Sequence, residues 1–153
     1  MLDDLLERIL AAEGDPAARH AGLGMLLAAA HGRAREGMND ELRPLGIDVR
    51  GFSMLLALDV YGPSSQRRLI DFTGIDKSTM VRIVDDLEDG GLVRRERSPQ
   101  DRRAHAIRLT GDGARTLESA RRAGVAVGER VFGRLGPDER DQLVGLLRRL
   151  AAR

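Results

Sequence analysis

The chain has 153 residues, which suits one domain or one domain with helical extensions. Aromatic residues make up only 3% of the sequence, so aliphatic side chains must form the core, and this composition favours helices over a β-sandwich. The formal net charge of +1 says little about partners, so any nucleic-acid signal must be local. The absence of cysteine excludes disulfides, thiolate nucleophiles, cysteine-based zinc sites and thiol redox sensing.

Membrane and targeting segments are not indicated by the sequence. No stretch approaches the roughly 18 uninterrupted apolar residues that a transmembrane helix needs. The first residues include Asp3 and Asp4, whereas a secretory signal would begin with basic residues. These features predict a cytoplasmic protein without a membrane contact.

The first part of the chain is predicted to be helical. Leucine and isoleucine recur at helical spacing over residues 2–13, and the Gly-Asp-Pro of residues 14–16 interrupts the pattern. A long helix is predicted from Pro16 to about Leu42, because proline suits the first position of a helix. Residues 23–30 are apolar nearly all round, which in a small protein indicates a contact between subunits.

The middle of the chain is predicted to hold three shorter helices. Their apolar periodicity places them over residues 48–61, 65–73 and 77–89. Ser64 is expected to cap the second of these helices and Asp76 the third.

The last part of the chain combines a hairpin with two more helices. Two short runs around a turn predict a β-hairpin over residues 92–97 and 104–109. Thr110 is expected to cap a helix that extends to about Leu135, and residues 136–139 carry the start signal of a final helix.

The second and third of the shorter helices are typical of a helix-turn-helix, with Gly74 in the turn. In this motif the N-terminal part of the second helix reaches the base edges in the major groove of DNA. The candidate recognition side chains, which can hydrogen-bond bases and phosphates, are Lys77, Ser78, Thr79 and Arg82. The later part of this helix is acidic, and its carboxylates are expected to point away from DNA or to pair with arginines; they are Asp85, Asp86, Glu88 and Asp89.

The hairpin is predicted to form an arginine-rich wing beside this helix. Arginines outnumber acids in it, and arginine suits the narrow, electronegative minor groove. The candidate DNA contacts of the wing are Arg97, Arg102 and Arg103. Asp101 is expected to form a structural ion pair, because phosphates would repel its carboxylate.

Residues 92–113, LVRRERSPQDRRAHAIRLTGDG, resemble the wing signature of the MarR family of transcriptional regulators. In that signature an Asp-x-Arg at the wing tip, here Asp101 and Arg103, precedes an apolar strand. The strand ends in a Leu-Thr pair with a glycine three residues after the threonine, matched here by Leu109, Thr110 and Gly113. Similarity to the recognition helix and its surroundings extends the resemblance to residues 45–47, 74–82 and 87–93.

The resemblance covers about residues 45–113 and implies a mainly α-helical protein with a small β-wing. It implies N-terminal dimerisation helices over residues 1–49, a winged helix-turn-helix DNA-binding domain over 50–110 and C-terminal dimerisation helices over 111–153. The implied function is sequence-specific regulation of transcription, by a ligand-responsive repressor that binds a pseudo-palindromic operator in double-stranded DNA as a homodimer. The separate helix over residues 2–13 departs from many family members.

Two other function classes compare less well with the sequence. The acidic second half of the recognition helix keeps open a winged-helix module that binds protein and not DNA. An enzyme is disfavoured, because the sequence has no nucleophile elbow, P-loop or dinucleotide fingerprint. No cofactor is expected, and three scattered histidines without cysteine disfavour a metal site. A small-molecule effector is an expected partner, with His20, His31 and Asp59 as candidate pocket residues.

Overall fold

The computed structural model of the protein describes residues 2–11, 15–97 and 105–152. The chain forms two compact units, Met1–Gly37 and Met38–Arg153. Among the described residues, none of the helices has both the length and the apolar character needed to cross a membrane.

The first unit is helical, as the sequence predicts. It consists of α1 (Leu2–Leu10) and most of α2 (Pro16–Leu42), whose last residues belong to the second unit. The Asp15 carboxylate caps α2 by accepting hydrogen bonds from the N–H groups of Ala17 and Ala18, at 2.9 Å and 3.2 Å. Three leucines of the apolar segment are exposed to solvent, at 61%, 41% and 44%; they are Leu23, Leu26 and Leu27.

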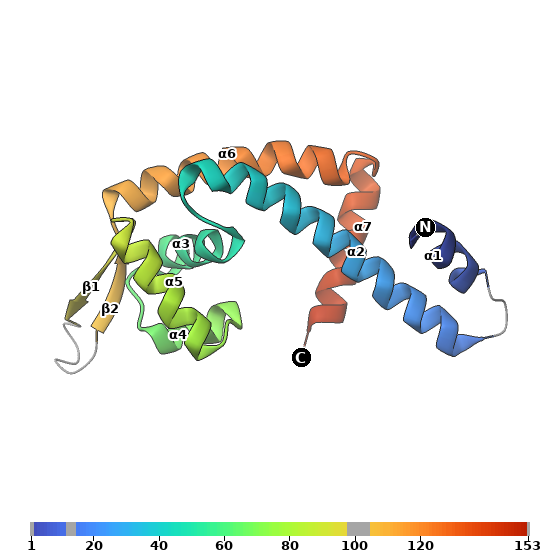
Figure 1. The fold of residues 1–153 in the computed structure, drawn as a ribbon, viewed down its shortest axis with the longest axis horizontal. Coiled ribbons are helices and arrows are strands. Elements are labelled where there is room, and N and C mark those ends of the chain that lie inside the picture. Colours follow the sequence, from blue (N-terminus) through green and yellow to red (C-terminus); the bar gives the residue numbers. More distant parts are fainter. Residues whose placement is uncertain (1, 12–14, 98–104, 153) are drawn as a thin grey trace. The chain divides into compact units, whose positions relative to one another are not determined.

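The second unit holds the remaining elements. After a 3-10 turn, η1 (Arg43–Leu45), these are α3 (Val49–Tyr61), α4 (Gln66–Thr73), α5 (Lys77–Asp89), β1 (Val93–Arg97), β2 (His105–Leu109), α6 (Gly111–Phe132) and α7 (Pro137–Ala151). Figure 1 shows α3, α4 and α5 gathered beside the hairpin, while α6 leads from the hairpin to α7. This order confirms the predicted mainly helical fold with a small β-wing.

The core of the second unit joins α3, α4 and α5 to the hairpin and α6. Its most deeply buried side chains, each no more than 1% exposed, include Leu55, Leu69, Met80, Ile107 and Leu117, which come from five different elements. Burying one side chain of this size contributes about 1.5–3 kcal/mol. Ile107 therefore packs the hairpin against the helices, and the base of the wing is part of the core.

The predicted cap of α4 is wrong by one residue. Ser64 is 2% exposed and pairs with β2, because its N–H donates to the Ile107 carbonyl at 3.1 Å and its carbonyl accepts from the Ile107 N–H at 2.8 Å. The cap is Ser65, whose Oγ accepts from the Arg68 N–H at 3.3 Å. Since the backbone of Ser64 is engaged by the sheet, the helix can begin only after it.

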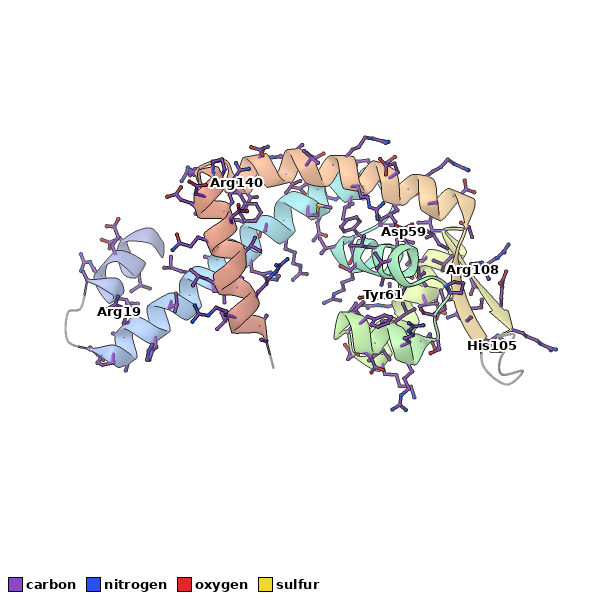
Figure 2. All side chains as sticks on the ribbon, turned by 180° about the vertical axis from the view of Figure 1, so that it is seen from behind. Arg19, Asp59, Tyr61, His105, Arg108 and Arg140 are labelled. Carbon is purple, nitrogen blue, oxygen red and sulfur yellow. The ribbon has the colours of Figure 1, made fainter. Side chains whose placement is uncertain are left out.

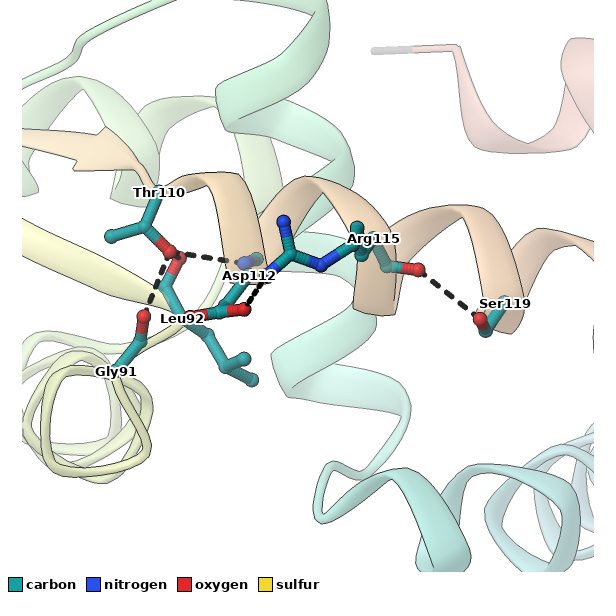
Figure 3. Close-up of polar contacts among 7 residues, drawn as sticks. Gly91, Leu92, Thr110, Asp112, Arg115 and Ser119 are labelled. Atoms are coloured by element: carbon teal, nitrogen blue, oxygen red, sulfur yellow. Dashed lines mark hydrogen bonds and ion pairs between the residues drawn. The ribbon is translucent and has the colours of Figure 1, made fainter.

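Thr110 joins the wing to α6 and confirms the predicted cap (Figure 3). Its Oγ1 accepts a hydrogen bond from the Gly113 N–H at 3.0 Å. Its hydroxyl donates toward the carbonyl oxygens of Gly91 and Leu92, which lie 2.7 Å and 3.0 Å away. The first turn of α6 is thus bonded to the segment between α5 and β1. At the other end, α6 stops at Phe132, three residues before the predicted Leu135.

Candidate nucleic-acid interface

α4 and α5 form the predicted helix-turn-helix. Gly74 ends α4 in the left-handed conformation, with φ of 68°, and its N–H donates to the Ile70 carbonyl at 2.8 Å. A side chain at this position would be strained, which explains the glycine. Asp76 then caps α5 by accepting from the Thr79 N–H at 2.9 Å. The turn between α4 and α5 and the cap of α5 are thus formed by residues that are close together in the sequence.

The predicted recognition side chains lie in the first two turns of α5. Lys77, Ser78 and Arg82 are exposed, and Thr79 is half-buried. The Ser78 hydroxyl donates to Asp76 Oδ1 at 2.6 Å. This part of α5 therefore offers polar side chains to solvent at the end of the helix where groove-reading residues lie in helix-turn-helix proteins.

A groove of about 630 Å³ runs between the start of α3 and the middle of α5. Arg43, Arg50 and Arg82 line it together with Asp48 and Asp86. Asp48 is already engaged as the cap of α3, where it accepts a backbone N–H at 2.8 Å. Arg43 is paired with Asp40 at 2.9 Å, so the three guanidinium groups in and beside the groove are matched by three carboxylates, and the groove as a whole has no net positive charge to attract phosphate.

The cap of α5 predicts a dependence of stability on pH. Hydrogen bonds from the Ser78 hydroxyl and the Thr79 N–H hold the pKa of the Asp76 carboxyl well below its usual range. Because the folded pKa is depressed, this stabilisation is fully present above the unfolded pKa of about 4 and is lost as the pH falls below it. Asp76→Asn keeps a capping acceptor without the titration, so its free energy of unfolding should fall less than that of the wild type between about pH 5 and pH 3. Urea titrations across this range measure the difference, and equal losses in the two proteins would contradict it.

Of the three predicted DNA contacts of the wing, one lies among the described residues. Arg97 is exposed at the end of β1 and lies opposite His105 in the β-ladder. Arg102 and Arg103, together with Asp101, lie outside the described residues. Their roles remain predictions.

Two arginines on the outer face of the wing share one carboxylate. Arg94 and Arg108 stand opposite each other in the ladder, where like charges repel. Glu96 lies between them, 2.6 Å from Arg94 and 2.9 Å from Arg108. A hydrogen bond from Arg108 and the charge of Arg94 hold the pKa of Glu96 below its ordinary value. The positive charge that the sequence predicts for the wing is therefore reduced at these residues.

Another wing arginine pairs with the recognition helix. Arg95 of β1 forms ion pairs with Asp85 and Glu88 of α5. This confirms the expected pairing with arginine for two of the four acids, while Asp86 and Asp89 are exposed. The sequence did not indicate which arginine would be the partner, because Arg95 lies on a different element from the two acids.

The candidate effector residues fall in different units. His20 and His31 are exposed residues of α2 in the first unit. Asp59 lies near the end of α3 in the second unit, where Arg121 of α6 donates to its carboxylate at 2.7 Å (Figure 2 labels Asp59). A contact with an effector stays a prediction for all three residues. Within the described ranges, no group of three histidine or acidic side chains could hold a metal ion.

An apolar hollow on α3 and α4 was not indicated by the sequence. Its volume is about 490 Å³, and its lining includes Val60, Tyr61, Phe72 and Ile75. The rings of Tyr61 and Phe72 are stacked with centroids 4.0 Å apart, and the Arg68 guanidinium lies 5.1 Å from the Phe72 ring. Pockets for small molecules usually have volumes of roughly 300–1,000 Å³ and mostly apolar walls. The hollow therefore has the size and lining of a small-molecule site.

Known proteins with similar sequences are transcriptional regulators. A family model described as MarR family matches residues 45–104. The HTH-type transcriptional repressor NicR of Pseudomonas putida is 36% identical over 99 residues, which make up 65% of this chain and 63% of NicR. The chain spans 52% to 63% of the length of the curated relatives it matches.

Solved structures extend the likeness over most of the chain. CouR from Rhodococcus jostii RHA1, bound to p-coumaroyl-CoA, is 32% identical with a TM-score of 0.75, over 84% of this chain and 91% of CouR. A mutant of MarR from E. coli, complexed with operator DNA, has the same fold, with a TM-score of 0.81 at 24% identity over 91% of this chain and 100% of that protein. With its helix-turn-helix, its hairpin and these relatives, the chain belongs to the MarR family of winged-helix transcriptional regulators.

Proposed function

We propose that this chain represses transcription by binding a pseudo-palindromic operator as a homodimer, and that a small molecule releases it. The observation that carries the proposal is the start of α5, where a capped helix offers Lys77, Ser78 and Arg82 to solvent, beside a hairpin with Arg97 at the end of β1. A regulator of this kind acts on DNA in the cytoplasm.

Each part of the winged domain has a proposed role. Lys77, Ser78, Thr79 and Arg82 read bases and phosphates in the major groove. Arg97, Arg102 and Arg103 place the wing in the adjacent minor groove, with Asp101 holding an arginine in position. Two such domains in a symmetric dimer would place their recognition helices roughly 34–36 Å apart, one turn of DNA.

The proposed dimer uses residues 1–49 and 111–153. Several apolar side chains on α6 and α7 are exposed, with Val125 at 69% and Leu150 at 68%. A hollow of about 390 Å³ between these two helices is lined by Phe132, Leu143 and Leu147, among others. Contiguous exposed apolar surface on a soluble domain typically marks an interaction site. A second copy would cover it in a symmetric interface.

Release by a small molecule is supported by the relatives and by the apolar hollow on α3 and α4. NicR is named as a repressor, and CouR is bound to p-coumaroyl-CoA. In this chain the stacked Tyr61 and Phe72 offer an aromatic wall for a flat, largely apolar ligand. His20, His31 and Asp59 are further candidate contacts.

The test is the affinity of the full chain for duplexes from its own promoter region, measured at several salt concentrations. Binding should weaken steeply with salt, because each neutralised phosphate releases counterions. Arg82→Ala should weaken binding about tenfold and lower the slope of log affinity against log salt by about one. Repeating the titration with p-coumaroyl-CoA and with small aromatic acids tests release by a ligand.

A matched control is Arg122→Ala, which removes an exposed arginine of α6 that pairs with Glu118, outside the helix-turn-helix and without loss of an apolar side chain from the proposed dimer surface. It should leave affinity and salt slope unchanged. If the wild type binds no duplex with a salt-dependent affinity, including duplexes selected from a random pool, the proposal is wrong. That result would favour the alternative module that binds protein.

A further inference from the structure

The second half of α5 is acidic, although this helix is proposed to enter a groove of DNA. Carboxylates beside phosphates are repelled, and this repulsion is strongest where water is excluded. Asp85 and Glu88 lie three and six residues beyond the proposed contact Arg82 on the same helix. These two acids therefore act through their contacts within the chain.

Both carboxylates converge on one residue of the wing. The guanidinium of Arg95 donates to Glu88 Oε2 and to Asp85 Oδ1. The backbone N–H of Arg95 donates to Glu88 Oε1 at 2.7 Å. Glu88 thus bonds both the side chain and the main chain of β1, and these bonds hold its pKa below the ordinary value. A planar guanidinium that bridges two carboxylates has one preferred geometry, so the contact fixes direction as well as distance.

The strand register places Arg95 on the inner face of the wing. Arg95 is opposite Ile107, and Val93 precedes it by two residues, so all three side chains share one face of the hairpin. Val93 and Ile107 are buried, at 2% and 1% exposure. Arg95 has a side chain 29% exposed, whereas Arg94 on the outer face is 60% exposed. Arg95 is therefore directed toward the helices and away from the surface that a phosphate could approach.

We propose that Arg95 is a positioning residue, which holds the wing at a fixed angle to the recognition helix through Asp85 and Glu88. The inference rests on the proposed function, because a fixed angle matters when one duplex must meet both elements at once. Two carboxylates outweigh one guanidinium, so this cluster has no net attraction for phosphate. The acids of α5 act on DNA binding through Arg95 and not by contact.

The test compares Arg95→Ala with Arg94→Ala, which removes the same charge from the neighbouring position on the outer face. Two quantities are measured: hydrogen exchange of the β1 amides in the free protein, and affinity with salt slope for a duplex bound by the wild type. Arg95→Ala should speed exchange at residues 93–97 about tenfold and weaken binding about tenfold, with an unchanged salt slope. Arg94→Ala should leave exchange of the Arg95 amide as in the wild type.

Conservative variants separate positioning from general destabilisation. Arg95→Lys keeps the charge but can bridge the two carboxylates less well, so it should restore part of the affinity and of the exchange protection. Glu88→Gln keeps the side-chain volume and an acceptor, and it replaces Arg95→Ala as the test if that variant fails to fold. It should speed exchange of the Arg95 amide without a change in salt slope.

Two results would overturn the inference. One is unchanged β1 exchange in Arg95→Ala and in Glu88→Gln. The other is a salt slope lowered by about one in Arg95→Ala, which would make Arg95 a phosphate contact. If the wild type binds no duplex, the proposed function fails, but the exchange contrast between the Arg95 and Arg94 variants still decides whether the bridge holds the wing.

Discussion

Replacing Gly113 with alanine is expected to lower the free energy of unfolding by about 3 kcal/mol, because the new methyl group has no room. A Cβ at this position would lie 2.0 Å from the Leu92 carbonyl oxygen and 2.8 Å from Leu109 Cδ1. The Leu92 carbonyl cannot retreat easily, since the backbone N–H of Thr110 donates to it at 3.1 Å and the Thr110 hydroxyl lies 3.0 Å away. The start of α6 would have to move away from the wing. Urea unfolding followed by circular dichroism measures the loss.

Gly111→Ala is the matched control at the start of the same helix. A Cβ there would meet only the flexible end of Arg115, at 3.7 Å. Its effect should stay within about 0.5 kcal/mol of the wild type, as for most surface substitutions. Equal stabilities for the Gly111 and Gly113 variants would mean that the close packing of α6 on Leu92 is not required for folding.

Gly113 also shows what can and what cannot be predicted from the sequence. In the sequence, this glycine stands out only through its resemblance to a family signature. The structure gives the physical reason, because the start of α6 packs directly against the backbone carbonyl of Leu92. Elements whose signals are local were predicted well: the cap at Asp76, the turn at Gly74 and the cap at Thr110 all hold in the structure. Each of them depends on residues within one helical turn.

Features that depend on long-range contacts were missed or misplaced. Ser64 and Ser65 are equally good caps as residue types, and only the pairing of Ser64 with Ile107 decides between them. The partners of Arg95 lie on a different element, so the sequence could not show which arginine pairs with Asp85 and Glu88. The stacked Tyr61 and Phe72 belong to two helices whose crossing no periodicity reveals. In each case the missing information is which elements meet.

A double substitution on α7, Leu147→Glu with Leu150→Glu, is expected to convert the proposed dimer into a monomer. The two leucines are 39% and 68% exposed in the single chain, on the apolar face that a second copy is proposed to cover. Full burial of an exposed leucine contributes about 1.5–3 kcal/mol, and covering the exposed part of each of these two contributes a fraction of that, whereas burying an unpaired carboxylate is strongly unfavourable. Sedimentation at micromolar concentration should show a wild-type dimer and a monomeric variant. Affinity for a palindromic duplex should fall about a hundredfold or more, because the second half-site is no longer bound by a linked domain.

Arg148→Glu separates the loss of the apolar face from the change in charge. It shifts the charge of α7 as far as the double substitution does, but it alters an exposed arginine and removes no apolar side chain. The Arg148 variant should remain a dimer and keep most of its affinity for the palindrome. A monomeric wild type would end the dimer proposal. A double variant that stays dimeric would instead place the dimer contact on other surfaces, among them the exposed leucines of α2. The hollow between α6 and α7 would then not be filled by a second copy and would be open to a ligand.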